Sequence, residues 1–245
     1  MIIEVMNGDK PPPAQPTVMV CCIGQHFLPG VLEAANRALR YAGSQGHGGI
    51  LNVILDICVG DAMGVGDMRD MAAVAALNER ADYMLMLEND VVLAEDALTR
   101  LLALGRPVVT PYLWPAYAPG HGKHGIGLGD SCPPTLEKGD EIVRTSDPMV
   151  YPKQGLVPLR WHVMSCLLWS TAVFRHLGPR IFHHSAPVTN YEQTLFDYLR
   201  SQGYTLWQDT DTRVDLLRPP GSPEPRKALG TMGMGPGPVK LARSL

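Results

Sequence analysis

Two acidic residues behind a short apolar run carry the main chemical signal of this sequence. Glu88 and Asp90 follow residues 83–87, a run too short for an isolated helix and suited to a buried strand. Acidic groups at the carboxyl end of a strand lie where open α/β sheets place their ligands. The two residues are two positions apart, so on extended backbone their side chains point the same way and could bind one hard cation. The alternative is an acidic turn that only caps the following helix.

Two other charged residues lie where they could bind a phosphate or accept a proton. Arg69 begins a predicted helix after a glycine-containing loop, where a guanidinium and free backbone N–H groups can bind phosphate. Its alternative role is a surface ion pair with Asp67 or Asp70. Glu192 lies in the first turn of a predicted helix, where the macrodipole favours its ionised form and it could accept a proton. An ordinary first-turn acid has the same pattern.

Composition limits the classes of function. The chain has 245 residues, of which 45% are hydrophobic and 18% charged, which suits a folded domain with a sizeable core. Its net charge of −3 provides no overall attraction to nucleic acid or to an anionic membrane. No stretch is long enough for a membrane span, and the N-terminus lacks a secretion-signal pattern. Four of the five cysteines lie in apolar runs, as free buried thiols do, which favours a cytoplasmic protein.

Strands and helices alternate over the first 110 residues, which predicts an α/β fold with a mostly parallel sheet and crossover helices. The apolar patterns predict strands at 17–23, 49–59, 83–87 and 107–109, and helices at 31–41, 68–80 and 94–103. After 111–159 the pattern resumes with a strand at 161–169, helices at 170–177 and 191–200, and a last strand at 204–217. Residues 1–16 form a proline-rich N-terminal extension, and 218–245 form a tail without periodicity.

The segment 111–159 has many Pro and Gly residues and no clear period, which is typical of functional or mobile segments. It contains His121, Lys123 and His124. These residues, His124 in particular, could close over a diphosphate as a lid. The alternative is a solvent-exposed loop without a binding role.

Three blocks of sequence, in this order, resemble the family-2-like GT-A glycosyltransferases. The first runs from Arg69 and Asp70 through an alanine-rich helix to Glu88-Asn89-Asp90, and is similar to the family's segment joining an Arg-Asn pair to its DxD metal motif. The second, residues 164–174, resembles the strand and short helix at the floor of the acceptor site. The third, residues 192–206, resembles the family's Glu-Asp helix with the Gly-Tyr pair and last strand that follow it. Together the blocks cover most of residues 17–217.

The resemblance implies a GT-A fold, that of nucleotide-diphospho-sugar transferases, with a nucleotide-binding half at 17–110 and an acceptor half at 111–217. It implies transfer of a sugar from a UDP- or GDP-sugar to an acceptor hydroxyl, with Mn²⁺ or Mg²⁺ on the departing diphosphate. The implied metal ligands are Glu88, Asp90 and a group of the last strand, for which Asp215, Asp211, Asp209 or water are candidates. The implied donor-binding residues are Asp56 or Asp61 for the base or ribose, then Arg69, Asn89 and His124, and the implied general base is Glu192.

The sequence departs from the family pattern at three places. The metal motif reads Glu-Asn-Asp, the Glu-Asp pair reads Glu192-Gln193, and the last strand has no metal-binding His. A retaining enzyme, or a degenerate domain that only binds a sugar nucleotide or a partner, therefore stays open. A nucleotidyltransferase is a further alternative, but residues 24–27 lack the Gly-rich basic signature it would need after the first strand. The acceptor, whether saccharide, protein, lipid carrier or modified nucleic-acid base, and the oligomeric state also stay open; the chain favours a soluble acceptor.

Overall fold

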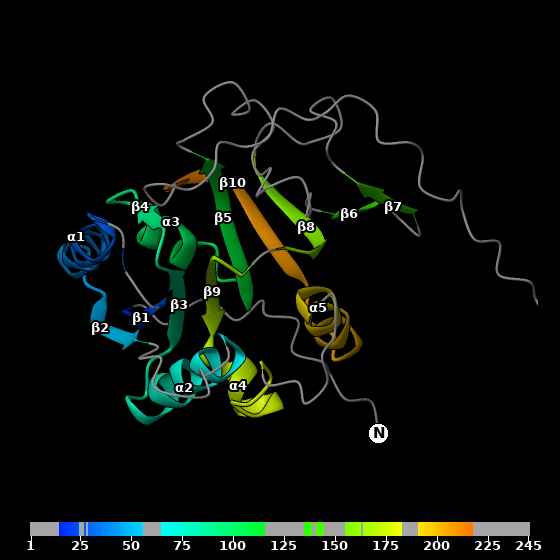
Figure 1. Ribbon diagram of the computed structural model, residues 1–245, viewed down its shortest axis with the longest axis horizontal. Helices are drawn as coiled ribbons and strands as arrows, with labels where there is room; N and C mark the ends of the chain where they lie inside the picture. Colours follow the sequence, from blue (N-terminus) through cyan, green and yellow to red (C-terminus); the bar gives the residue numbers. More distant parts are fainter. Residues whose placement is uncertain are drawn as a thin grey trace, which may run out of the picture.

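The computed structural model describes residues 15–24, 27, 29–55, 65–115, 135–138, 141–144, 155–162, 164–182 and 191–217. Within them the chain forms one sheet with helices on both sides (Figure 1). The strands are β1 (Thr17–Gly24), β2 (Gly48–Leu55), β3 (Tyr83–Glu88), β4 (Val91–Leu93), β5 (Val108–Pro115), β6 (Thr135–Lys138), β7 (Glu141–Arg144), β8 (Leu156–Trp161), β9 (Cys166–Ser170) and β10 (Leu206–Leu216). The helices are α1 (Val31–Ser44), α2 (Val65–Asn78), α3 (Ala97–Ala103), α4 (Thr171–Leu177) and α5 (Tyr191–Ser201).

The strand order in the sheet is β2-β1-β3-β9-β5-β10-β8-β6-β7, and β4 pairs with the end of β10. β1 is parallel to both β2 and β3, and β10 is parallel to β5. β9 is antiparallel to both of its neighbours, β3 and β5, so those two strands run in the same direction. In sheet order, the six strands from β2 through β1, β3, β9 and β5 to β10 all run in the same direction except β9. This confirms the predicted α/β fold with a mostly parallel central sheet.

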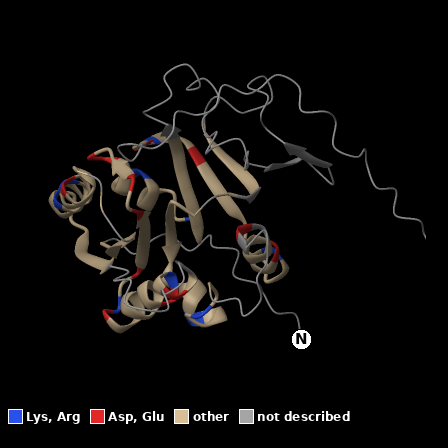
Figure 2. Cartoon of the chain, in the orientation of Figure 1, with Lys and Arg blue, Asp and Glu red and all other residues tan. Residues whose placement is uncertain are grey.

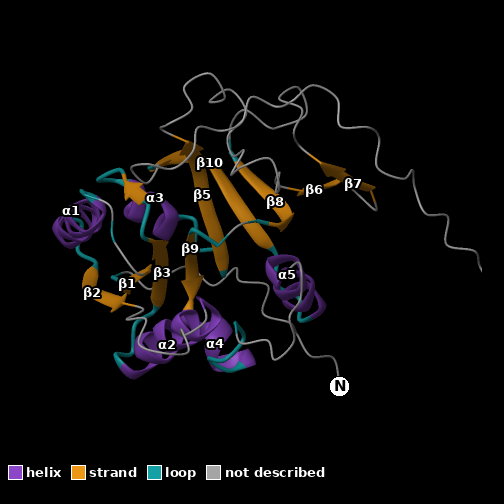
Figure 3. Ribbon diagram, viewed as in Figure 1, coloured by secondary structure: helices purple, strands orange, loops and turns teal. Residues whose placement is uncertain are grey.

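Helices cover both faces of the sheet because successive strand residues point to opposite sides (Figure 3). In β1, Val18, Val20 and Cys22 pack with residues of α1 and α3, while Met19 and Cys21 pack on the side of α2, α4 and α5. Both sets are almost completely buried. The predicted buried free thiols are confirmed for the cysteines in the described residues, which are Cys21, Cys22 and Cys166.

Strand β5 is longer than predicted, because a bulge in its neighbour accommodates a proline. The sequence predicts a strand at residues 107–109, because these residues form a short apolar run and the pattern fails from Pro111 on. In the structure β5 continues to Pro115. The ladder with β10 shifts register between Asp209 and Arg213, directly after the pair Pro111–Asp209. Three residues of β10 are left unpaired with β5 in this bulge, and the ladder resumes after it, so β5 continues past Pro111.

The prediction of a single strand at 161–169 is wrong. β8 ends at Trp161 beside β6 and β10, whereas β9 begins at Cys166 between β3 and β5. The connection therefore crosses over the sheet from one strand to the other, and it places His162 and Met164 in the interior. Apolar residues in the connection extend the hydrophobic run, so the pattern does not mark the point where the chain leaves one strand.

An aromatic cluster joins β9 to the segment after α4. The Trp169 ring centroid lies 5.6 Å from that of Phe174 and 5.3 Å from that of Phe182, the second pair edge to face. All three side chains are buried. The sequence predicts Trp169 as a core residue, and the structure confirms it.

We expect Trp169→Ala to lower the free energy of unfolding by about 3–5 kcal/mol, since it removes a large fully buried ring. The exposed Tyr198 provides an aromatic control. Tyr198→Ala should change stability by less than about 0.5 kcal/mol. Urea denaturation followed by circular dichroism measures both, and equal losses in the two variants would contradict the assigned core.

Candidate functional site

The acidic turn follows the carboxyl end of β3 and lies beside the end of β10. β3 ends at Glu88, and a two-residue turn leads into β4. The backbone N–H of Leu217 donates to the carbonyl oxygen of Asp90 at 2.7 Å, so the end of β10 runs beside the turn. Figure 2 shows acidic residues around β4 and on β10, while β5 and β9 carry no charged residue. Charged residues are thus absent from the two strands that lie between β3 and β10 in the sheet.

Both carboxylate oxygens of Glu88 accept short hydrogen bonds. Arg69 Nη2 donates to Oε1 at 2.7 Å, and Ser165 Oγ donates to Oε2 at 2.7 Å. The Glu88 backbone N–H donates to the Ser165 carbonyl oxygen at 2.9 Å. Arg69 belongs to α2 and is almost completely buried, so its guanidinium pairs with Glu88 in the interior rather than at the surface. Asp70 accepts the backbone N–H of Phe182 at 2.9 Å.

Asp90 has a different environment from Glu88. Its Oδ1 is buried and has no hydrogen-bond partner among the described residues. The pKa of Asp90 is raised from 3.8 to about 6, first by burial and then by the negative charge of Glu88, against a smaller opposing hydrogen bond from its own backbone. A carboxylate that is partly buried, with one oxygen that receives no hydrogen bond from the described residues, is destabilised in its charged form. A cation at this position would remove that penalty.

Asn89 packs against the end of β1. A Cβ atom built on Gly24 would lie 2.6 Å from Asn89 Cβ and 2.9 Å from its Cγ, closer than real Cβ contacts. Gly24 therefore permits an approach between β1 and the turn that any other residue would block. The contact holds the middle of the turn against the neighbouring parallel strand.

Asp215 lies on β10 opposite Val92 of β4, and Val92 follows directly after the turn and Val91. Its Oδ1 accepts from Arg213 Nη2 at 3.1 Å and from Nε at 3.3 Å, in a pair whose side chains are about half exposed. Among the residues that the structure describes, no three His, Cys, Asp or Glu side chains come close enough together to hold a metal ion. The described protein ligands of a cation here would therefore number one or two.

The remaining predicted residues lie elsewhere on the chain. Glu192 is in the first turn of α5, whose buried face packs into the core on the side of α2 and α4. Asp56, Asp61 and His124 lie outside the described residues, as does the tail 218–245. None of the helices in the described ranges is long and apolar enough to cross a membrane.

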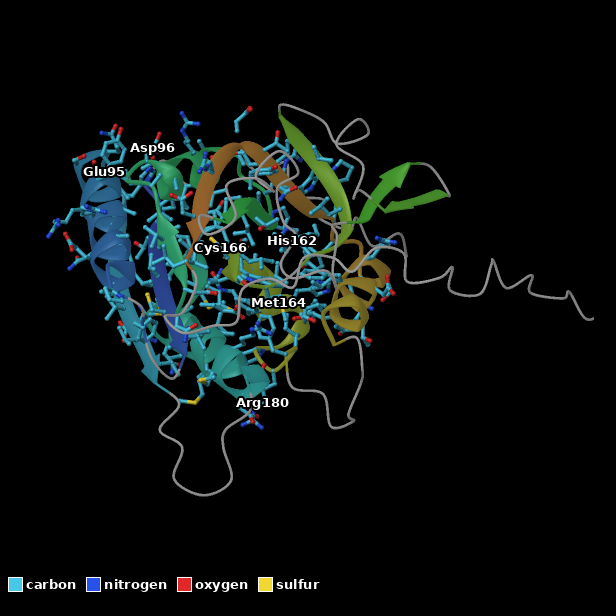
Figure 4. The ribbon with its side chains drawn as sticks, turned by 45° about the horizontal axis from the view of Figure 1, so that its top comes forward. Glu95, Asp96, His162, Met164, Cys166 and Arg180 are labelled. Atoms are coloured by element: carbon cyan, nitrogen blue, oxygen red, sulfur yellow. The ribbon has the colours of Figure 1, made fainter. Side chains whose placement is uncertain are left out.

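Ser165 and Gly24 are site residues that sequence reasoning did not select. Ser165 is 77 positions from Glu88 in the chain, and no local pattern connects them. A row of buried polar groups continues from it: Thr110 Oγ1 donates to the Cys166 carbonyl oxygen at 2.9 Å, and the side chains of Gln208 and His162 lie 3.4 Å apart. Figure 4 shows His162, Met164 and Cys166 near the middle of the molecule, where the connection crosses.

Comparison with known proteins adds information on the fold. No protein-family model matches the sequence, and a search of curated proteins found no match. Among solved structures the chain is similar to GalNAc-T7, a GT-A glycosyltransferase crystallised with UDP, GalNAc and Mn²⁺; the TM-score is 0.54, the identity 10%, and the match covers 84% of this chain. The fold is GT-A-like.

The match covers 44% of the GalNAc-T7 chain, so this chain spans less than half of that protein. A second similar structure is A197 from STIV, with a TM-score of 0.45, 10% identity and coverage of 84% of this chain and 95% of that one. At 10% identity the likeness to GalNAc-T7 describes the fold and not the chemistry.

The raised pKa of Asp90 gives a stability prediction. Its folded-state value of about 6 exceeds the unfolded value of 3.8, so protonation favours the folded state, and stability from this group is lost as the pH rises through about 6. We expect Asp90→Asn, measured in EDTA, to be about 1–2 kcal/mol more stable than wild type at pH 8. The advantage should disappear near pH 4, where folded wild type is neutral at this position. Urea titrations at both pH values test this, and an advantage independent of pH would contradict it.

The Gly24–Asn89 contact gives a second prediction. Gly24→Ala should lower stability by about 1–3 kcal/mol, because the new methyl group has no room beside Asn89. Adding Asn89→Gly should recover part of that loss. The control is Gly43→Ala, at a helical glycine with no atom within 4 Å of the added Cβ, which should be stabilising by about 0.5–1 kcal/mol. Equal stability of the two alanine variants, measured by thermal unfolding, would rule out the steric contact.

Proposed function

We propose that this protein is a metal-dependent glycosyltransferase that moves a sugar from a nucleoside-diphosphate donor to an acceptor hydroxyl. The GT-A-like fold supports the proposal, since the similar structure of GalNAc-T7 was determined with UDP, GalNAc and Mn²⁺. The observation that carries it is the Asp90 carboxylate, which is partly buried at the carboxyl end of β3 with an oxygen that has no partner among the described residues. A carboxylate of this kind is suited to binding a cation rather than to forming an ion pair within the protein.

The donor set fits a hard divalent cation that keeps most of its other ligands as water or phosphate oxygen. Mg²⁺ and the similar Mn²⁺ are commonly held by one or two carboxylates plus substrate phosphates. In this proposal Asp90 is the main ligand of the cation. Glu88 and Asp215 are the other carboxylates at this end of the sheet and are the candidates for a second ligand. The cation would neutralise negative charge on the departing diphosphate.

The other predicted residues take roles around the donor and the acceptor. Arg69 and Asn89 are proposed to support the diphosphate end of the donor, Arg69 through the charge it places beside Glu88. Asp56 or Asp61 would receive the base or ribose of a UDP- or GDP-sugar, and His124 would belong to a covering loop. Glu192 would accept the proton of the acceptor hydroxyl, helped by its place in the first turn of α5.

A second candidate is a domain that binds the nucleotide without catalysing transfer. Glu88 and Asp215 already accept hydrogen bonds from arginines, which leaves Asp90 as the carboxylate of the turn with an unpartnered oxygen among the described residues. A site with a single open carboxylate would hold its cation weakly. Binding and turnover must therefore be measured separately.

The test combines thermal shift and donor hydrolysis with Mn²⁺ and a panel of UDP- and GDP-sugars. A donor at about 100 times its Kd should stabilise the wild type by about 2.7 kcal/mol, and only when Mn²⁺ is present. Asp90→Ala should lose this shift and reduce hydrolysis by about 100-fold or more, since metal charge stabilisation is worth several kcal/mol. The control is Asp96→Ala, which breaks an exposed ion pair with Arg100. A metal-dependent shift without turnover supports the binding domain, and no shift with any donor rejects both candidates.

A further inference from the structure

We infer that Glu88 is a positioning residue: Arg69 and Ser165 hold its two carboxylate oxygens, and this clamp fixes the turn that presents Asp90. The inference assigns Glu88 a role different from the cation ligand that its spacing predicts. It adds Ser165 to the site as the second half of the clamp. The part that concerns the cation rests on the proposed function, whereas the part that concerns the turn does not.

The Arg69 half of the clamp joins α2 to the end of β3. The guanidinium side chain is 5% exposed and that of Glu88 is 32% exposed, and their closest atoms are 2.7 Å apart. A charge-assisted bond of this length is among the stronger hydrogen bonds in proteins. Because Arg69 is buried, replacing Glu88 takes a charged partner away from the guanidinium in a region with little water, which costs more than the loss of an exposed pair. Glu88 is therefore bound to α2 by a strong constraint.

The Ser165 half joins β3 to the residue before β9. Ser165 Oγ donates to Glu88 Oε2, and the Glu88 backbone N–H donates back to the Ser165 carbonyl oxygen. Side chain and backbone are thus connected in both directions between the same two residues. Ser165 is itself almost buried, and Thr110 holds the next residue, Cys166, by donating to its carbonyl oxygen. The hydroxyl consequently has a fixed orientation toward the carboxylate.

The two acids of the turn therefore have different tasks. The oxygens of Glu88 are used within the protein by donors from α2 and from the crossing connection. Asp90, two residues later, has a buried oxygen without a partner among the described residues. On this turn Glu88 is therefore the residue that fixes the backbone, and Asp90 is the residue that can bind a cation. The two acids are not equivalent ligands.

A mutant cycle on Mn²⁺ affinity, measured by electron paramagnetic resonance with and without UDP, separates the two roles. The variants are Glu88→Gln, Arg69→Met, their double variant and Ser165→Ala. A positioning role predicts that Glu88→Gln and Ser165→Ala each weaken Mn²⁺ binding by about 10–100-fold. It also predicts that the double variant regains about tenfold over Glu88→Gln, because the buried positive charge is gone and the amide oxygen at position 88 can still accept from Ser165. A double variant as weak as Glu88→Gln, with Ser165→Ala unchanged, would show a direct ligand and overturn the inference.

Hydrogen–deuterium exchange of the peptide containing residues 88–93 tests the clamp without any metal. Arg69→Met and Ser165→Ala should each increase exchange there by about tenfold or more, as expected when a local opening is made easier. Arg100→Gln is the matched control, because it breaks an arginine–carboxylate pair of similar length, 2.8 Å, between side chains about half exposed. If exchange at 88–93 matches wild type in both clamp variants, the inference is wrong. If wild type binds no Mn²⁺ with or without UDP, the proposed function fails, and the exchange data alone decide the inference.

Discussion

Strand β9 has to satisfy two neighbours at once, and the arrangement of the site follows from this constraint. It lies antiparallel between β3 and β5, with Leu87 opposite Cys166 on one side and Val108 opposite Trp169 on the other. In the buried centre of a sheet each backbone N–H and C=O group needs a partner, so the register can hardly slip. This register brings Ser165 to Glu88 at one end of β9 and Trp169 into the aromatic cluster near the other end.

The acidic turn sits on a frame that is otherwise apolar. β5 and β9 carry no charged residue, and β3 carries only Glu88, at its last position. Charge inside these three strands would be costly, and on them it is confined to the end of β3, where Arg69 offsets Glu88. The charged form of Asp90 stays disfavoured, as the raised pKa of its carboxyl group shows. Residues that lower stability in the free protein are common where a ligand is to be bound.

The sequence allowed many elements to be predicted because their signals are local. The alternating strand and helix patterns predicted β1, α1, α2 and β3 to within a few residues. Two predictions failed through long-range effects. β5 continues past Pro111 because β10 bulges beside it, and residues 161–169 divide between two strands that are not neighbours in the sheet.

By itself the sequence determined the α/β alternation, the position of the acidic turn after a buried strand, and the buried state of Trp169 and three cysteines. These features depend on residues close together in the chain, where apolar period and turn chemistry act. Only the tertiary structure decided that Arg69 and Ser165 hold Glu88, and that Asn89 lies against Gly24. It also decided that one oxygen of Asp90 has no partner within the described part of the chain. Spacing showed that both acids could face one way. Partners 19 and 77 positions away, brought together by the sheet, made their environments different.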